Sequence, residues 1–128
     1  MSQIRRYFTT PIYYVNDVPH IGHAYTSIAV DFLARFSRLS GDETRFLTGT
    51  DEHGLKIQKA AEKLSISSLE LCNKNSEIFR NLTKTLNLSN DDFIRTTEDR
   101  HKDGATYLWN LLFEKGDIYL DEYTGWYS

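Results

Sequence analysis

The sequence has very few cysteines and prolines and no long apolar run. Cys72 is the single cysteine among 128 residues, which excludes an internal disulfide and a cysteine-rich zinc site. A helix that spans a bilayer needs about 18 consecutive apolar residues, and the sequence has no such run. The start of the chain also lacks the apolar segment of a signal peptide. We therefore expect a globular protein of the reducing cytoplasm, with no membrane partner.

The charge of the chain is nearly balanced. The formal net charge at pH 7 is −3, and charged residues make up 26% of the sequence. A domain that binds nucleic acid over its surface is usually strongly basic, and this stretch as a whole lacks such an excess of positive charge. No dinucleotide-binding glycine motif and no phosphate-binding loop of the Walker type occurs either. These absences argue against a dinucleotide oxidoreductase and against a P-loop enzyme.

The sequence alternates between segments typical of strands and segments typical of helices. Runs rich in β-branched and aromatic residues predict strands, and apolar residues spaced three and four apart predict helices. The predicted strands are 7–10, 44–48 and 93–96. The predicted helices lie between Pro19 and Gly41, over 57–64, from a capping box at Ser67 and Glu70 to Leu86, and over 98–115. Residues 118–127 predict an extended or hairpin segment.

The predicted helices carry apolar stripes. A stripe of this kind is typical of a helix face that packs on a core. In the first helix the stripe consists of Ile21, Tyr25, Ile28, Ala29, Phe32, Phe36 and Leu39. In the last helix the residues expected to point inward are Tyr107, Leu108, Leu111 and Leu112.

The order of these elements predicts the fold class. Strands that alternate with helices form an open parallel sheet with right-handed crossovers, which is an α/β fold. About three strands with flanking helices correspond to the N-terminal half of a doubly wound, Rossmann-like sheet. A sheet that ends after three strands leaves an apolar edge unpaired. We therefore expect the chain to be the N-terminal part of a longer enzyme.

The start of the first helix carries the residues most suited to chemistry. Unpaired backbone N–H groups and the positive end of the helix dipole make a helix N-terminus a site for phosphate. His20 and His23 are three residues apart, so both imidazoles project from one side of the first turn. Gly22 between them has no side chain, which lets a flat ring such as adenine approach the backbone. The alternative is that two surface histidines simply cap a helix.

Asp51 follows the second predicted strand. In open α/β sheets ligands bind beyond the carboxyl ends of the strands, so Asp51 and the two histidines are expected at one rim. Asp51 can bind a cation there, such as a substrate ammonium, across a crevice shared with His20 and His23. A position of Asp51 on the far side of the sheet from the histidines would contradict this hypothesis. A metal site of Asp51, Glu52 and His53 is a rival interpretation, although adjacent residues rarely converge on one ion.

Three segments closely resemble methionyl-tRNA synthetases, which are class I aminoacyl-tRNA synthetases. They are residues 8–16 (FTTPIYYVN), 19–25 (PHIGHAY) and 46–54 (FLTGTDEHG). Residues 125–128 (GWYS) resemble the start of the connective insertion of that family. The resemblance implies that residues 1–116 form the N-terminal half of a Rossmann-like catalytic domain and that residues 117–128 begin the inserted domain.

The resemblance also implies roles for single residues at an ATP site. His20 and His23 correspond to the catalytic, ATP-binding histidines of the His-Ile-Gly-His signature. Gly22 corresponds to the glycine that faces adenine. ATP would be used as its magnesium complex, and no metal ligand is implied in this segment.

Three further residues correspond to the methionine site of the family. Asp51 resembles the residue that pairs with the methionine α-ammonium, and the backbone of Ile12 resembles a second partner of that group. Tyr14 resembles the wall of the side-chain pocket, where an aromatic ring suits an apolar thioether. Tyr13 fits either this pocket or simple core packing.

The implied reaction is methionine–tRNA ligation. Methionine and ATP form methionyl-adenylate, and the methionyl group then passes to methionine tRNA. The family's Lys-Met-Ser-Lys-Ser loop, most of its connective insertion and its anticodon-binding domain are absent from this sequence. The chain alone is therefore expected to be nearly inactive, and tRNA would bind through the absent parts. Two other hypotheses remain: a small nucleotidyltransferase complete in itself, and a non-catalytic truncated paralogue that acts as a binding module.

The remaining chemically versatile residues have simple structural explanations. Cys72 is expected to be a buried helix thiol, because no neighbouring charge pattern suggests activation. Arg95, Arg100 and His101 are expected to form a solvated patch, with a weak contact to tRNA or phosphate as the alternative.

Overall fold

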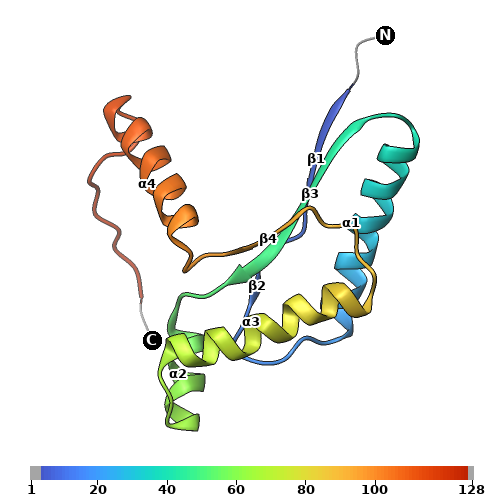
Figure 1. Cartoon of the computed structure of the whole chain (residues 1–128). Coiled ribbons are helices and arrows are strands. Elements are labelled where there is room, and N and C mark those ends of the chain that lie inside the picture. Colours follow the sequence, from blue (N-terminus) through green and yellow to red (C-terminus); the bar gives the residue numbers. More distant parts are fainter. Residues whose placement is uncertain (1–3, 127–128) are drawn as a thin grey trace. The chain divides into compact units, whose positions relative to one another are not determined.

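Four strands and four helices follow one another in the computed structural model, which describes residues 4–126 (Figure 1). In chain order they are β1 (Arg5–Thr9), β2 (Tyr13–Tyr14), α1 (Ile21–Leu39), β3 (Glu43–Asp51), α2 (Leu55–Leu64), α3 (Ser68–Thr85), β4 (Asp92–Arg95) and α4 (Asp99–Glu114). The chain divides into two compact units, Met1–Thr97 and Glu98–Ser128. All three predicted strands and all four predicted helices are confirmed, with boundaries shifted by one or two residues at most of their ends.

The first unit is built on a parallel sheet centred on β3. β1 pairs with the first half of β3, from Arg5 opposite Glu43 to Thr9 opposite Leu47, and β4 pairs with residues 47–50 of β3. Leu47 and Thr50 each have partners on two sides, so β1 and the short β2 lie along one edge of β3 and β4 lies along the other. The predicted sheet of about three strands is thus confirmed, with β2 continuing the line of β1 after an interruption.

Local chemistry explains where the sheet is interrupted and where it is tight. Pro11 between β1 and β2 has no backbone N–H and cannot donate to the ladder. At Gly49 the strands β3 and β4 lie unusually close together: a Cβ at this position would lie 2.1 Å from the carbonyl oxygen of Ile94 in β4. A residue without a side chain therefore lets β4 approach β3 closely at this point.

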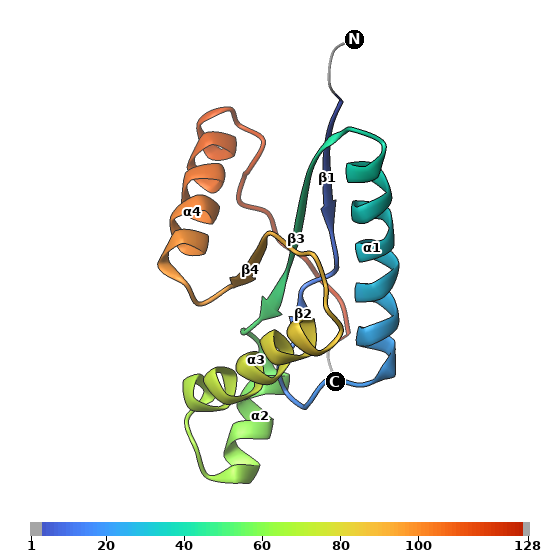
Figure 2. The same ribbon diagram turned by 45° about the vertical axis from the view of Figure 1, so that its right-hand side comes forward.

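Both crossovers of the first unit move across the sheet in the same direction. Right-handed connections then place α1 and α3 on the same face, and Figure 2 shows α1 running alongside β1 and β3. The loop after α3 is tied to α1, where Arg38 donates to Ser89 Oγ (2.7 Å) and to Asp91 Oδ2 (2.8 Å). The buried core lies between α2, α3 and the strands. It consists of Tyr13, Val15, Ile57, Ala61, Leu71, Cys72, Phe79 and Phe93.

The predicted orientation of the first helix is wrong. The apolar stripe of α1 is exposed; for example, Ile21, Phe32 and Leu39 have exposed fractions of 84%, 66% and 88%. The buried residues of α1 are instead Ser27, Asp31, Ala34 and Ser37. Short and polar side chains face the strands because they bond to them and to the neighbouring loops: Ser37 Oγ, for example, accepts a hydrogen bond from Thr44 Oγ1 at 2.8 Å.

The second unit consists of α4 and an extended segment. No residue of α4 is buried, and Tyr107 and Leu108 of the expected inward stripe are exposed. Of the extended or hairpin segment expected over residues 118–127, the described residues 118–126 form no strand and hence no hairpin, while Tyr127 lies outside the part that the structure describes. Across residues 4–126, every helix is too short or too polar to cross a membrane.

Candidate active site

The two histidines form the cap of α1. His20 is the N-cap residue, in extended backbone conformation, and its Nδ1 accepts a hydrogen bond from Gly22 N–H at 3.1 Å. In return, Nδ1 of His23 accepts from the backbone N–H of His20 at 3.0 Å. This is the reciprocal arrangement of a capping box, with imidazoles in the places that Ser or Thr and Glu normally occupy. The histidines therefore organise the helix start as well as projecting from it.

The capping bonds fix the tautomer of each neutral ring. Because Nδ1 accepts a backbone N–H in both histidines, the ring proton lies on Nε2. The rings lie with their centroids 3.8 Å apart, so both Nε2–H groups are presented from one place at the positive end of the helix. Two neighbouring N–H donors at a helix N-terminus are suited to bind the oxygens of a phosphate chain.

His23 is further held by aromatic rings from two other elements. Its ring centroid lies 4.8 Å from that of Tyr13 and 5.0 Å from that of Phe79 in α3, both in edge-on contact. Burial against these rings, and then the neighbouring His20, lower the pKa of His23 below its ordinary value of 6.5. His23 is therefore neutral at physiological pH and acts as a hydrogen-bond donor rather than as a cation.

A hollow of about 560 Å³ brings four of the six predicted site residues together. Ile12, Tyr14, His20 and His23 all line it. Its volume is within the range of small-molecule sites, roughly 300–1,000 Å³. Asp17 also lines the hollow, and its Oδ1 accepts from Val18 N–H at 2.7 Å in a local turn.

The two adjacent tyrosines have different environments. Tyr13 is a core residue: it is 9% exposed, and its hydroxyl is hydrogen bonded to Ser27 Oγ of α1 at 3.0 Å. Tyr14 is 51% exposed, and Nζ of Lys56 in α2 lies 5.5 Å from its ring centroid. Core packing thus explains Tyr13 and does not explain Tyr14. Sequence reasoning missed Lys56, which a contact across 42 positions brings to the ring.

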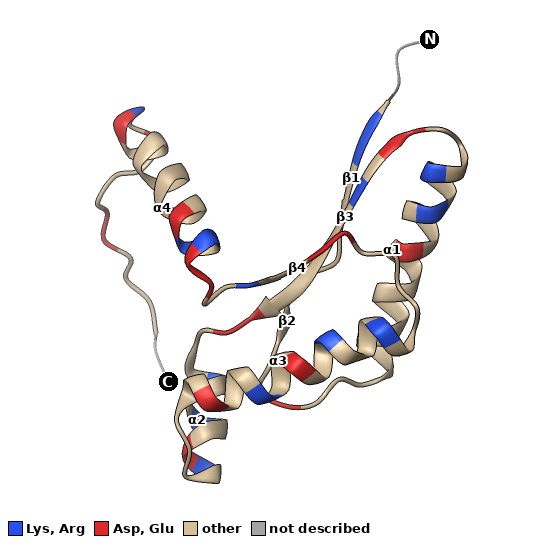
Figure 3. Ribbon diagram, in the orientation of Figure 1, with Lys and Arg blue, Asp and Glu red and all other residues tan. Residues whose placement is uncertain are grey.

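Asp51 is the last residue of β3 and lies at the acidic segment that Figure 3 shows at the end of that strand. It does not line the hollow. Tyr14 is its register partner, and Tyr13 pairs with Thr50 in the same way. Side chains alternate along strands, so Asp51 and Tyr14 point to one side of the sheet and Tyr13 and Thr50 to the side covered by the helices.

The register places Asp51 on the side of the sheet opposite the one where His23 packs against Tyr13, which counts against a crevice shared by Asp51 and the histidines, although residues of both orientations line the hollow. Its lining includes His23, which packs on Tyr13 on the helix-covered side, and Tyr14, which shares the orientation of Asp51. Direct contact of Asp51 and the histidines with one ligand stays a prediction.

Gly22 is not part of the lining either. A Cβ at this position would lie 2.9 Å from Cε1 of His20, so the missing side chain makes room for the imidazole of the cap. The predicted role of Gly22 toward adenine stays a prediction beside this observed one.

The orientation of Glu52 argues against the rival interpretation of a metal site at Asp51, Glu52 and His53. The carboxylate of Glu52 is engaged by Arg95, which donates from Nε at 2.7 Å and from a terminal nitrogen at 2.9 Å. Nδ1 of His53 is hydrogen bonded to Thr96 Oγ1 at 3.0 Å. Asp51, Glu52 and His53 thus point to different partners, and among residues 4–126 no three His, Cys, Asp or Glu side chains are grouped to hold a metal ion.

The expectation that Arg95 belongs to a solvated patch is wrong. Its side chain is only 21% exposed and is ion-paired with the fully buried carboxylate of Glu52. The expectation for Cys72 is confirmed: the thiol is buried and donates weakly to the carbonyl oxygen of Glu52 at 3.7 Å. Burial, and then the negative charge of Glu52, raise the pKa of Cys72 to about 11, so the thiol is unreactive at neutral pH.

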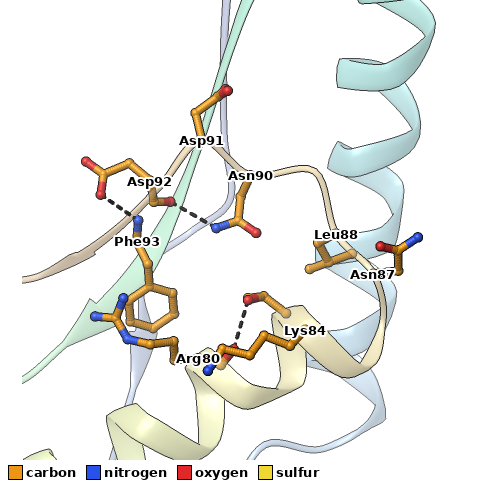
Figure 4. A pocket seen from close by; sticks show the side chains of 9 residues that line it. Arg80, Lys84, Asn87, Leu88, Asn90, Asp91, Asp92 and Phe93 are labelled. Carbon is orange, nitrogen blue, oxygen red and sulfur yellow. Dashed lines mark hydrogen bonds between the residues drawn. The ribbon is translucent and has the colours of Figure 1, made fainter.

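A second hollow, of about 390 Å³, lies at the end of α3 (Figure 4). Its charged and polar groups are engaged locally: the guanidinium of Arg80 covers the ring of Phe93 at 4.6 Å, and Asn90 donates to the carbonyl oxygen of Asp92 at 3.2 Å. None of the predicted site residues lines it. We therefore interpret this second hollow as a structural feature of the loop that leads into β4, and not as part of the candidate site.

The lowered pKa of His23 predicts a pH-dependent stability. Unfolded His23 takes up a proton near pH 6.5, whereas the folded protein resists protonation until a lower pH. The free energy of unfolding should therefore fall as the pH decreases below about 6.5. His23→Gln keeps a capping acceptor at this position but does not titrate, so its stability should decrease less between pH 7.5 and pH 5.5. Urea unfolding of both proteins at the two pH values measures this, and equal decreases would contradict it.

Comparison with known proteins identifies the family. A family model described as tRNA synthetases class I (M) matches residues 6–128. A methionine–tRNA ligase of Mesorhizobium japonicum is 56% identical over 128 residues, which are 100% of this chain and 25% of the relative. A methionine–tRNA ligase of Rickettsia bellii is 57% identical over 122 residues, which are 95% of this chain and 24% of the relative.

A solved structure agrees with these relatives. Mycobacterium tuberculosis methionyl-tRNA synthetase in complex with methionyl-adenylate has a TM-score of 0.91 and 48% identity to this chain, over 98% of this chain and 25% of that one. The chain thus spans about a quarter of the length of the relatives it matches. Because the family model matches nearly the whole chain and the parallel α/β fold agrees, this chain belongs to the class I tRNA synthetases (M), the methionine family.

Proposed function

We propose that the protein to which this chain belongs is a methionine–tRNA ligase. The observation that carries the proposal is the hollow at the start of α1, where the two capping histidines meet Ile12 and Tyr14. The M. tuberculosis relative, with a TM-score of 0.91 to this chain, was solved with methionyl-adenylate. The proposed substrates are therefore L-methionine, ATP as its magnesium complex, and methionine tRNA, in the cytoplasm.

In the proposed first step, a carboxylate oxygen of methionine attacks the α-phosphorus of ATP in line, and pyrophosphate leaves. His20 and His23 are the catalytic residues, because their Nε2–H groups can donate to phosphate oxygens on which negative charge increases in the transition state. Gly22 would lie against adenine. The two imidazoles need no proton transfer in this role, in which Nδ1 of each ring accepts a bond of the cap and Nε2 is left to donate.

Methionine would lie toward β2 and the end of β3. Its α-ammonium would pair with the Asp51 carboxylate and the carbonyl oxygen of Ile12. Its thioether would contact Tyr14, whose exposed ring offers an apolar and polarisable surface. A ribose hydroxyl of the terminal adenosine of the tRNA then attacks the methionyl carbonyl carbon of the adenylate, and AMP leaves. In this proposal residues 1–116 belong to the catalytic domain, and residues 117–128 begin the inserted domain.

Methionine-dependent ATP–pyrophosphate exchange tests the function. The protein expressed from its full reading frame should exchange pyrophosphate with methionine and not with leucine, and the 128-residue chain alone should be nearly inactive. The comparison of methionine with leucine serves as the control, because leucine has an ammonium and a carboxylate but no thioether. Exchange that does not depend on methionine would contradict the proposed substrate, and no exchange by the full protein would contradict the proposed enzyme.

A further inference from the structure

Glu52, the residue directly after Asp51, carries a buried carboxylate at the end of β3. Its side chain is 0% exposed, yet each of its oxygens has hydrogen-bond donors. Arg95 donates to both oxygens, at 2.7 and 2.9 Å, Thr50 Oγ1 donates at 2.9 Å, and Thr97 Oγ1 donates as well. A bidentate guanidinium fixes the orientation of a carboxylate as well as its charge.

The backbone of the same segment is also anchored. Glu52 N–H donates to Thr96 Oγ1 at 2.8 Å, and the carbonyl oxygen of Glu52 accepts the weak hydrogen bond of Cys72. Arg95 is itself braced by α3, because a terminal nitrogen donates to Asn73 Oδ1 at 2.7 Å. The turn that follows Asp51 is thus tied to the end of β4 and to α3, through residues 20 to 45 positions away in sequence.

Asp51 itself has a looser environment. Its carboxylate accepts a long hydrogen bond from His53 N–H, at 3.4 Å, and its side chain is half-buried at the end of β3. The orientation of Asp51 therefore depends on the backbone on either side of it. On one side this is the β3 ladder, and on the other it is the segment that Glu52 anchors.

Glu52 and Asp51 also differ in how their negative charges are compensated. Burial alone would raise the pKa of Glu52, but the hydrogen bonds from Arg95, Thr97 and Thr50 outweigh it, so the pKa lies below its ordinary value. Glu52 is therefore ionised, and Arg95 compensates its charge. Without this ion pair, two adjacent carboxylates would compete for one cationic group. With it, Asp51 is the acidic group at the end of β3 that has no ion-pair partner among the described residues 4–126.

We infer that Glu52 and Arg95 are a positioning pair for amino-acid binding. The pair holds the turn after β3 and withdraws the charge of Glu52, so that Asp51 receives the α-ammonium of the amino acid. This inference rests on the proposed function, because it assigns Glu52 a role through Asp51 in methionine recognition. Glu52 touches neither substrate, and its replacement should affect methionine and not ATP.

The test uses Glu52→Gln in the full-length protein and steady-state pyrophosphate exchange. The KM for methionine should rise about tenfold, the scale of a small misplacement of a binding group, while the KM for ATP changes less than about twofold. Asp31→Asn is the matched control. Asp31 is also a buried carboxylate, held by Arg35 at 2.7 Å and by Ser89, but it lies in the middle of α1. This control should lower the stability and leave both KM values unchanged.

A double-mutant cycle distinguishes positioning from a general loss of structure. If Glu52 acts through Asp51, Glu52→Gln should change the methionine KM less than about twofold in a protein that already carries Asp51→Asn. Thr97→Val removes a single hydrogen-bond donor to Glu52 and is the variant to measure if Glu52→Gln does not fold. We expect it to raise the KM for methionine about threefold.

The outcomes separate this inference from the proposed function. A wild-type protein without methionine-dependent exchange would contradict the proposed function, and the inference with it. Normal exchange in the wild type, with an unchanged methionine KM in Glu52→Gln and Thr97→Val, would contradict the inference alone. Equal rises in the KM values of methionine and ATP would also contradict it.

Discussion

Replacement of His20 or His23 by alanine is expected to slow methionyl-adenylate formation by about 10²–10³-fold, the scale for loss of one preorganised donor to a transition-state charge. The physical reason is that each ring presents one Nε2–H at the helix N-terminus, because its Nδ1 accepts a backbone hydrogen bond of the cap. Pre-steady-state measurement of adenylate formation, with methionine and ATP both saturating, gives the rate of this step.

The capping role requires a matched pair of variants. An alanine at the N-cap costs about 1 kcal/mol of stability, so a slower rate could also come from a frayed helix. His20→Ser and His23→Glu restore the side chains of an ordinary capping box, which accept the backbone N–H groups of the cap but present no side-chain N–H to the phosphates. They should lose about as much rate as the alanine variants at nearly wild-type stability. Wild-type rates in both would show that the histidines only cap the helix.

Replacement of Asp51 by asparagine is expected to weaken methionine binding on the order of 10²-fold, because a charged partner of an ammonium is lost at a half-buried position. ATP binding should change less than about threefold, since the proposed ATP contacts come from the start of α1 and not from β3. Equilibrium binding of methionine and of ATP to the full-length protein measures the two effects separately.

A ligand without the ammonium sharpens this test. A methionine analogue that lacks only its α-amino group should bind the wild-type protein weakly and should bind the Asp51→Asn variant equally weakly. Equal losses of methionine and ATP affinity would indicate a distorted site. A loss for the analogue as large as that for methionine would show that Asp51 does not act on the ammonium.

Some features of the site could be read from short stretches of sequence. The strand–helix order and the placement of two histidines at the start of α1 depend on groups within about four residues of one another, although the helix begins at Ile21, after the N-cap His20, and not at Pro19 as predicted. Helix capping is such a local interaction, because the first N–H groups of a helix seek acceptors on adjacent residues. The segments that resemble methionyl-tRNA synthetases are equally local, and the comparisons confirm that family.

Other features were open until the elements were placed together. The apolar stripe of α1 predicts a buried face, yet the strands are covered by Ser27, Asp31, Ala34 and Ser37. Periodicity shows that a helix has two kinds of face, but which face is buried depends on what packs against it. Similarly, Tyr13 and Tyr14 are alike in sequence, and only their register with Thr50 and Asp51 buries Tyr13 in the core and leaves Tyr14 half-exposed on the other side of the sheet.

Arg95 shows most clearly what sequence alone cannot supply. Beside Arg100 and His101 in the chain it resembles part of a solvated patch, whereas in the fold it compensates a carboxylate 43 residues away. The sequence by itself determined the family, the order of the elements and the capped helix with its two imidazoles, since these depend on neighbouring residues. Only the tertiary structure decided the partner of Glu52, the buried face of α1 and the side of the sheet on which Asp51 lies. Each of these follows from contacts between segments distant in sequence, whose pairing the sheet register fixes.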